Sequence, residues 1–530
     1  MIRLGSRRWW ALAALVLSML TIGLDATVLN VALPTLATAL HAGTGALQWM
    51  VDAYILVFAG LLLPAGALGD RYGRKRLLIL GLGFFGTASA AAGHAGSAGQ
   101  LIAARAVMGV GAAVLTPVVM AVLPVIFPPA ERAKAIAIGA IGMGLGLPLG
   151  PIVGGYLLQH FWWGSVFAIN VPVAAVALAA VAVLVPESRD PAPPRPDLVG
   201  AGLSTLGLVA LVYGLIEAPD RGWRNHVVLG TLAVGLLLLT AFAAWERHTT
   251  DPMIDLGLFR RRRFLSGTLA TTVASFTLFG LLFVLPQYLQ AVRGHDALGT
   301  GLRLLPLIGG LVVGARASAT LILRVGSRAP IAAGLVLIAA GLGVGATTGA
   351  GSGYGLAACW LPVVGAGAGL ALAPAMDAVL GELPVARAGA GTAVTMTVRQ
   401  VGGALGVALL GSISANAYTH RLDVTGLPAP AVHIAQDSVH AAVALAGRLA
   451  DPALAASAHT AYTHAMDTVL ACCAAVAVSG AALIATLMPT GAAVAAPPAD
   501  PECGAEPRRS NMPANATAAS LGDGSAAEIQ

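Results

Sequence analysis

Residues Gly66–Arg76 read Gly-Ala-Leu-Gly-Asp-Arg-Tyr-Gly-Arg-Lys-Arg and separate two long apolar stretches. Five of the last seven residues are charged, so this run is not stable in the hydrocarbon core of a bilayer. The apolar stretches on either side are each long enough to cross that core as a helix. We therefore predict a short charged turn between two membrane-spanning helices. Four of the five charges are basic, which indicates the cytoplasmic face of the membrane.

The composition of the whole chain predicts an all-α polytopic membrane protein. Of the 530 residues, 57% are hydrophobic and 10% are charged, against about 25% charged residues in an average soluble domain. The net charge of +6 is then carried by cytoplasmic loops, so we expect no nucleic-acid-binding surface. The sequence contains no nucleotide-binding loop and no cysteine or histidine spacing typical of a metal site. We therefore expect no enzyme activity, no cofactor and no metal.

Fourteen membrane spans are predicted from the apolar runs. They lie near residues 11–34, 47–68, 77–95, 100–124, 135–157, 165–185, 198–217, 227–245, 265–289, 298–321, 329–348, 354–378, 392–416 and 466–488. An even number of spans puts both termini on the same side. Loops assigned to the inner side contain 21 of the 30 Lys and Arg residues, and loops assigned to the outer side contain 6. We therefore expect both termini in the cytoplasm. The excess of Arg over Lys, 28 to 2, is typical of a GC-rich bacterial genome and favours the bacterial cytoplasmic membrane.

The sequence repeats itself at an offset of about 253 residues. Residues 31–36 match residues 284–289, and residues 71–75 have a weaker counterpart at 324–328. We predict two six-helix halves, residues 1–186 and 251–488, with two inserted helices in residues 187–250. A long outer loop at 417–465 belongs to the second half. Residues 489–530 are predicted to form a disordered cytoplasmic tail.

Four motifs follow one another in the first half. They are Leu24–Pro34, which reads Leu-Asp-Ala-Thr-Val-Leu-Asn-Val-Ala-Leu-Pro, then the charged turn, then Leu101–Ala113, and finally the glycine-rich run Gly146–Gly155. Together they resemble the signature motifs of the major facilitator superfamily, in its fourteen-helix drug:proton antiporter branch. Members of that branch export quaternary ammonium compounds, methyl viologen and several antibiotics. The resemblance covers roughly residues 10–415 and the last span, and it implies the major facilitator fold.

The resemblance also implies roles for two motifs. It implies that the charged turn is a conformational latch carried by Gly69, Asp70, Arg71, Gly73 and Arg74; the alternative is a turn that only fixes topology through its positive charge. The run of Gly146, Gly150, Pro151, Gly154 and Gly155 corresponds to a motif of antiporters that seals the path against leak. A spacing of four residues puts three of these glycines on one helix face, where small residues let two helices approach closely. Ordinary tight packing is compatible with that role.

Three ionisable residues within the spans of the first half are candidates for proton coupling: Asp25, Asp52 and Arg105. A charge at this depth is costly unless it faces water or a partner. Arg105 is at a suitable depth to pair with either carboxyl. A carboxyl whose surroundings alternate between apolar burial and a nearby cation can bind and release a proton. The alternative is a structural ion pair that never titrates.

The second half offers weaker candidates. Asp377 and Arg399 lie near the inner ends of two spans and are predicted to pair as an inner gate. An aromatic stripe is formed by Phe276, Phe279 and Phe283, with Gln287 one helical turn beyond. Such a stripe can bind flat or cationic drugs. The alternative is a stripe that only packs against other helices or faces lipid. Arg316 in span 10 has no explanation. Some members of the family that handle divalent cations carry an acidic residue in this helix. Residues 298–323 contain none, which argues against dicationic substrates.

Together with the ionisable residues in the spans, the resemblance implies proton-driven efflux of lipophilic, cationic or antibiotic compounds across the cytoplasmic membrane, by rocking of the two halves. The expected partners are a small-molecule drug, protons and the lipid bilayer, and we expect a monomer. One alternative is a metabolite exporter or symporter on the same fold. An alternative of another class is a membrane sensor or scaffold that transports nothing.

Overall fold

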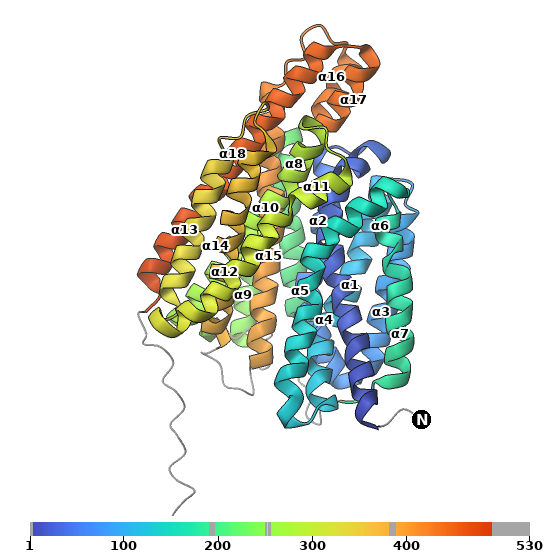
Figure 1. The fold of residues 1–530 in the computed structure, drawn as a ribbon, viewed down its shortest axis with the longest axis vertical. Helices are drawn as coiled ribbons and strands as arrows, with labels where there is room; N and C mark the ends of the chain where they lie inside the picture. Colours follow the sequence, from blue (N-terminus) through green and yellow to red (C-terminus); the bar gives the residue numbers. More distant parts are fainter. Residues whose placement is uncertain (1–3, 190–196, 250–251, 253–255, 381–387, 490–530) are drawn as a thin grey trace, which may run out of the picture. The chain divides into compact units, whose positions relative to one another are not determined.

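The computed structural model describes residues 4–189, 197–249, 252, 256–380 and 388–489, and these residues form helices and no strand (Figure 1). Thirteen helical stretches among them are long and apolar enough to cross a membrane. Helix α5 (Pro129–His160) has 32 residues and is long enough to be a fourteenth. The prediction of an all-helical protein with fourteen spans is therefore confirmed.

The first half is built from the helices that precede the inserted pair. They are α1 (Leu4–Ala39), α2 (Thr44–Tyr72), α3 (Arg74–Gly93), α4 (Ala98–Ile126), α5, α6 (Ser165–Ala168) and α7 (Asn170–Leu184). Helix α1 packs against α5 and α7, while α4 packs against α2 and α3. The predicted sixth span is broken at Ile169, so that α6 and α7 are separate helices.

The second half repeats this arrangement. Its helices are α10 (Arg262–Gln287), the π-helical turn η2 (Tyr288–Val292), α11 (Ala297–Arg303), α12 (Leu305–Val325), α13 (Arg328–Gly345), α14 (Tyr354–Leu380), α15 (Ala388–Arg421) and α18 (Pro452–Leu487). Helix α10 packs against α15 and α18, and α14 packs against α12 and α13, in the order seen in the first half. The internal repeat found in the sequence is thus visible in the helix packing. The predicted tenth span is two helices, α11 and α12, joined at Leu304.

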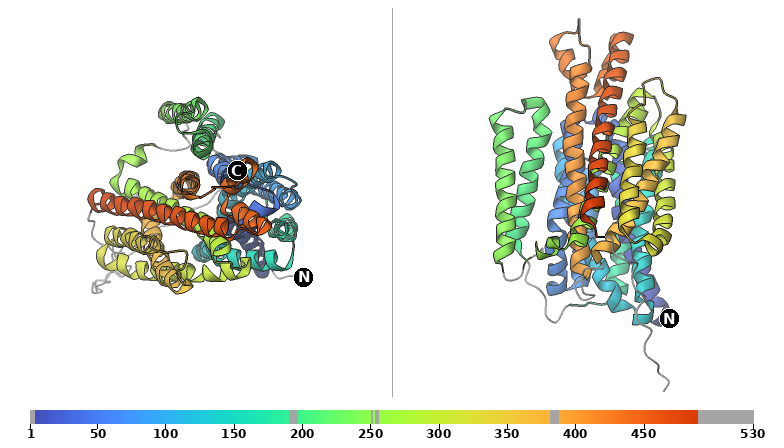
Figure 2. Two further views of the ribbon diagram at one scale, coloured as in Figure 1. Left: turned by 90° about the horizontal axis from the view of Figure 1, so that it is seen from above. Right: turned by 90° about the vertical axis from the view of Figure 1, so that its left-hand side faces the viewer.

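Two helical pairs lie outside the two six-helix bundles. The inserted helices α8 (Leu198–Arg221) and α9 (His226–His248) form a hairpin at the periphery of the bundle (Figure 2). Helix α8 touches both halves, through α2 and α15, and α9 is then joined by the short helix η1 (Leu256–Arg260) to α10. The predicted outer loop contains α16 (Ala429–Asp437) and α17 (Val439–Leu449), which we call the cap. The end of the bundle that carries the cap is the cap end, and the opposite one the basal end.

The two halves meet along a seam that lies toward the cap end. Helix α2 packs against α15, α1 against α10, and α5 against α11. The Gln48 amide of α2 donates hydrogen bonds to the carbonyl oxygens of Val407 and Ala408 on α15, at 3.0 and 2.8 Å. The cap adds a further link, because Thr44 Oγ1 donates to the carbonyl of Asp437 at 3.1 Å. The halves are therefore in contact at the cap end.

Candidate functional site

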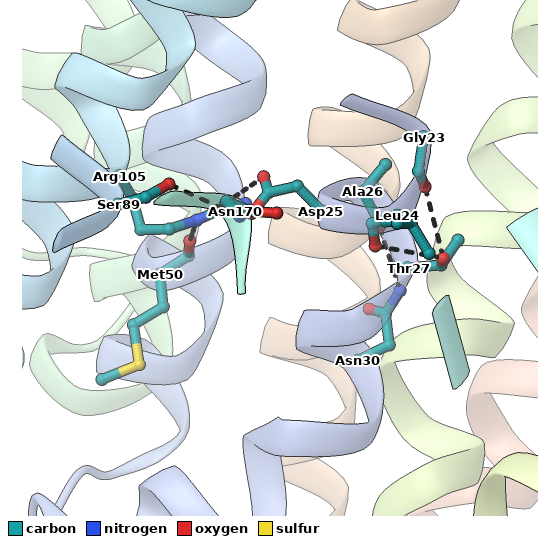
Figure 3. Close-up of polar contacts among 10 residues, drawn as sticks. All are labelled: Gly23, Leu24, Asp25, Ala26, Thr27, Asn30, Met50, Ser89, Arg105 and Asn170. Carbon is teal, nitrogen blue, oxygen red and sulfur yellow. Dashed lines mark hydrogen bonds and ion pairs between the residues drawn. The ribbon is translucent and has the colours of Figure 1, made fainter. Parts of the chain in front are cut away.

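The centre of the first half contains a buried ion pair between α1 and α4. Arg105 Nη1 lies 2.5 Å from Asp25 Oδ2, and the two side chains are 2% and 0% exposed (Figure 3). Arg105 Nε also donates to the carbonyl of Met50 on α2 at 3.0 Å, and its guanidinium lies 4.3 Å from the centre of the Tyr54 ring. Of the two partners that the sequence left open for Arg105, the structure therefore selects Asp25.

A second side of the same carboxyl is held by an amide from α7. Asn170 Nδ2 lies 3.5 Å from Asp25 Oδ1 and 3.4 Å from Ser89 Oγ on α3 (Figure 3). The break between α6 and α7 places Asn170 at the start of α7, where it is 2% exposed. The network thus joins all the long helices of the first half except α5. Sequence reasoning did not assign Asn170 a role, although it lies in an Asn-Val-Pro run inside a predicted span.

Asp52 is separate from this network. It is 0% exposed, and neither of its carboxylate oxygens has a hydrogen-bond partner among the described residues. Asp52 follows Gln48 by one helical turn, so it shares the face of α2 that packs against α15. Tyr54, which contacts Arg105, is two residues further on and so points about 200° away around the helix. The candidate proton-coupling residues therefore divide into a pair inside one half and a single carboxyl at the seam.

The glycine-rich motif of α5 brings this helix against α1 next to Asp25. A Cβ atom on Gly146 would overlap the backbone of Gly23 and Leu24. Thr27 Oγ1 donates to the Gly146 carbonyl at 3.2 Å across the same contact. A Cβ atom on Gly150 would likewise overlap the Thr27 side chain, and one on Gly154 would overlap the Val28 side chain. The predicted close approach of two helices is confirmed, and it continues across the seam, where Gly155 packs on α11 and Pro151 on Gly301.

The charged turn joins α2 and α3 at the basal end. Gly73 has a φ of 115°, in the region that favours glycine, and Gly69 packs closely on Val118 of α4. Asp70 pairs with Arg74 at 2.7 Å, within the turn itself. Arg71 lies 5.9 Å from the centre of the Tyr72 ring.

Glu187, which follows α7, completes this cluster. Its carboxylate accepts from the Lys75 backbone N–H at 3.2 Å and lies 3.6 Å from Arg76. The sequence singled out the basic residues but not Glu187, because nothing local marks it as their partner.

Asp377 and Arg399 are not joined in this structure. The Asp377 side chain on α14 is exposed, the Arg399 side chain on α15 is half-buried, and no ion pair or hydrogen bond links them. An inner gate made by this pair stays a prediction.

The aromatic stripe of α10 divides into two parts. Phe276 and Phe279 pack on Gly406 and Gly403 of α15, so these two residues take part in the packing between α10 and α15. Phe283 and Gln287 are buried and line a small pocket beneath the cap. The other residues that line this pocket are Thr44, Ser414, Ala415, Tyr418, Val439 and Tyr462. A role of the stripe in drug binding stays a prediction.

Comparison with known proteins identifies the family. Residues 15–407 match the family model of the Major Facilitator Superfamily. The chain belongs to the major facilitator superfamily. The superfamily consists of membrane transporters, and the chain is therefore no enzyme. The two six-helix halves and the two inserted helices described above constitute the major facilitator fold.

Several relatives within the superfamily have names that describe resistance or export. The chain is 36% identical over 374 residues to the tetracenomycin C resistance and export protein of Streptomyces glaucescens, which covers 70% of this chain and 69% of that one. It is 38% identical over 336 residues to the methyl viologen resistance protein SmvA of Salmonella typhimurium strain LT2, covering 63% and 68%. It is 41% identical over 317 residues to the multidrug efflux pump LfrA of Mycolicibacterium smegmatis, covering 59% and 63%.

Solved structures of the superfamily share the fold. A bacterial homologue of the human lysosomal transporter Spinster, in an inward-facing and occupied conformation, matches with a TM-score of 0.63 and 18% identity over 90% of this chain and 96% of that one. The peptide transporter PepTSo matches with a TM-score of 0.61 and 15% identity over 91% and 97%. At these identities the likeness shows the fold alone.

Proposed function

We propose that the protein exports lipophilic compounds, cationic drugs and antibiotics among them, from the cytoplasm in exchange for protons. Membership of the superfamily makes it a transporter. The names of three relatives, which describe tetracenomycin C resistance and export, methyl viologen resistance and multidrug efflux, support drug export. The observation that carries the proton-driven part is the buried carboxyl of Asp52, which has no hydrogen-bond partner at the seam.

Asp52 is the proton carrier in this proposal. An ionised carboxylate without a hydrogen-bond partner is too costly to bury, so the Asp52 side chain is neutral in the described conformation. Loss of the proton would leave a charge between α2 and α15, next to the hydrogen bonds of Gln48. The closed seam and the protonated carboxyl therefore stabilise each other, which is the thermodynamic link that an antiporter needs.

The direction of exchange follows from the predicted topology. The basal end carries the basic loops and is assigned to the cytoplasm, so the cap end is outside. With its halves in contact at the cap end, the described conformation is closed to the outside. When the seam opens outward, Asp52 is reached by the more acidic outer solution and takes up a proton. The protonated carboxyl then favours closure. Binding of the next drug molecule from the cytoplasmic side displaces this proton into the cytoplasm, so that proton entry is exchanged for drug exit.

Asp25 and Arg105 have a different part in this scheme. Their pair is buried among α1, α2 and α4 and holds these helices together. We propose that the pair couples movement of α1 and α4 to movement of α2, and with it to Asp52. The turn from Gly69 to Arg74 is proposed to latch the opposite conformation at the basal end. In this structure its described hydrogen bonds and ion pairs join it only to the first half and to residues 187–188. We also propose that the two halves and the inserted hairpin act as the rigid units of this motion, and that a monomer suffices for it.

The test compares Asp52→Asn with the control Asp423→Asn. Asp423 is an exposed acidic residue between α15 and the cap. Asp52→Asn imitates the protonated side chain and should leave the protein folded. We expect it to abolish resistance in cells and energy-dependent dye efflux, while Asp423→Asn behaves as the wild type. Efflux by Asp52→Asn that still follows the pH gradient would reject Asp52 as the carrier. A wild type that confers resistance to no compound in a chemically diverse panel would reject drug export, and would leave a metabolite exporter or symporter on the same fold.

A further inference from the structure

The middle of α12 carries an arginine that the mechanism above does not use. Arg316 lies nine residues before Val325, the end of the apolar stretch that begins at Ala297. Nine residues of helix span about 14 Å, so Arg316 is near the centre of a hydrocarbon core of about 30 Å. Its side chain is exposed, and it makes no hydrogen bond or ion pair with any described residue.

The buried face of α12 is on the other side of the helix. Gly310 and Gly314 pack so closely on the backbone of α14, at Pro362 and Ala366, that a Cβ atom on either glycine would overlap it. Ser318 continues this buried face. Arg316 stands two residues from Gly314 and from Ser318, so it points about 160° away from the contact with α14. The arginine is therefore not part of the packing that holds the second half together.

Arg316 lies on the side of α12 that is turned away from α14, on the segment that leads on from the contact of α11 with the first half. Gly301 of α11 packs on Pro151 of α5, and α12, which begins after the break at Leu304, also contacts α5. While α11 packs on α5, α12 runs away from α5 toward the basal end (Figure 1). At the level of Arg316 this side is uncovered by protein, which agrees with the exposed side chain. A guanidinium is costly at this depth against lipid, but it is hydrated where it borders a water-filled path between the halves.

We propose that Arg316 is a binding site for an anionic oxygen group, such as a carboxylate, phenolate or phosphate, on an amphiphilic substrate. The planar guanidinium offers paired N–H donors that match two such oxygens. No acid in residues 298–323 competes for it, and its charge repels a dication. This inference rests on the proposed efflux function and extends its substrate class to lipophilic compounds that carry a negative charge.

The experiment uses two dyes that share a xanthene ring system and differ in charge: fluorescein, which is anionic, and rhodamine 123, which is cationic. Binding is measured by fluorescence anisotropy with the purified full chain in nanodiscs of zwitterionic phosphatidylcholine. Arg316→Gln should bind fluorescein about tenfold more weakly, the loss expected for one charge-assisted hydrogen bond, and should bind rhodamine 123 as the wild type does. Arg316→Lys should keep most of the fluorescein affinity. Arg324→Gln, which removes an exposed arginine from the basal end of the same helix, is the matched control and should change neither.

Three results would overturn the proposal. The first is fluorescein binding by Arg316→Gln equal to that of the wild type. The second is equal dye binding together with a loss of bound phosphatidylglycerol, measured by native mass spectrometry after purification from cells, because the anionic group would then be a lipid headgroup. If Arg316→Gln does not fold, the fluorescein affinity of the wild type is measured at increasing salt concentrations, and it should fall as the salt concentration rises. An affinity that does not depend on salt is the third result that would overturn the proposal. The resistance panel with the wild type tests the proposed function separately, since resistance to no compound would reject drug export and leave the binding result standing.

Discussion

Replacing Arg105 with glutamine is expected to destabilise the protein more than almost any other single change to a polar side chain. The Arg105→Gln variant leaves Asp25, which is 0% exposed, with one long hydrogen bond of 3.5 Å from Asn170. Removing one member of a buried ion pair costs about 3–5 kcal/mol, because the other charge stays buried without compensation. We expect a loss of that size in the free energy of unfolding.

The double variant Asp25→Asn, Arg105→Gln separates the charge effect from the loss of packing. It removes both charges, so most of the lost stability should return. Arg8→Gln is a matched control, because Arg8 pairs with Glu131 at 2.9 Å at a site where both side chains are about one-third exposed. An ion pair of that kind contributes about 0–1 kcal/mol.

Unfolding of the purified variants in mixed micelles, followed by tryptophan fluorescence during titration with sodium dodecyl sulfate, measures these differences. A loss below about 1 kcal/mol for Arg105→Gln would refute the account of a strongly coupled buried pair. A double variant no more stable than Arg105→Gln would refute the assignment of the loss to the lone charge of Asp25.

Three further predictions concern other parts of the molecule. Gly146→Ala forces α5 away from Gly23 on α1 and should lower the free energy of unfolding by about 1–3 kcal/mol. Gly83→Ala, at an open site on α3, is the control and should not lower it. Equal effects of the two substitutions in the same micelle titration would contradict the packing argument. Burial lowers the pKa of His440 in the cap from 6.5 to about 4, so cap stability is full above pH 6.5 and falls by up to about 3 kcal/mol as the pH drops toward 4. Hydrogen exchange of the cap amides, corrected for intrinsic rates, should therefore accelerate between pH 7 and pH 5 in the wild type but not in His440→Gln, and the same pH response in both would be evidence against this burial effect. Asp70→Asn should lower the rate of drug efflux with little change in the unfolding midpoint. An unchanged efflux rate would reject the latch and leave the charged turn as a determinant of topology only.

The sequence predicted the fold well because its signals are local and strong. Span length, the charge of the loops and the repeat at an offset of about 253 residues follow directly from residue types and their spacing. The breaks at Ile169 and Leu304 were not predicted, since each leaves the apolar run intact and changes only the backbone.

The candidate site was predicted in part. Depth in the membrane identified Asp25 and Arg105 as potential partners. Helical spacing identified the glycine face of α5, at Gly146, that packs closely on another helix. Depth alone also grouped Asp52 with them, whereas the rotation of α2 puts that carboxyl on the opposite face, at the seam with α15. Glu187 and Asn170 were missed because their partners are distant in sequence and only the fold brings them together.

Proton movement driven by the drug itself tests the central claim most directly. Inside-out membrane vesicles from cells that produce the protein acidify their lumen during respiration, and a pH-sensitive dye reports the gradient. The account predicts that an exported drug, added outside, dissipates the gradient with the wild type and leaves it intact with Asp52→Asn. A gradient that persists in wild-type vesicles while the labelled drug accumulates inside them would contradict proton exchange.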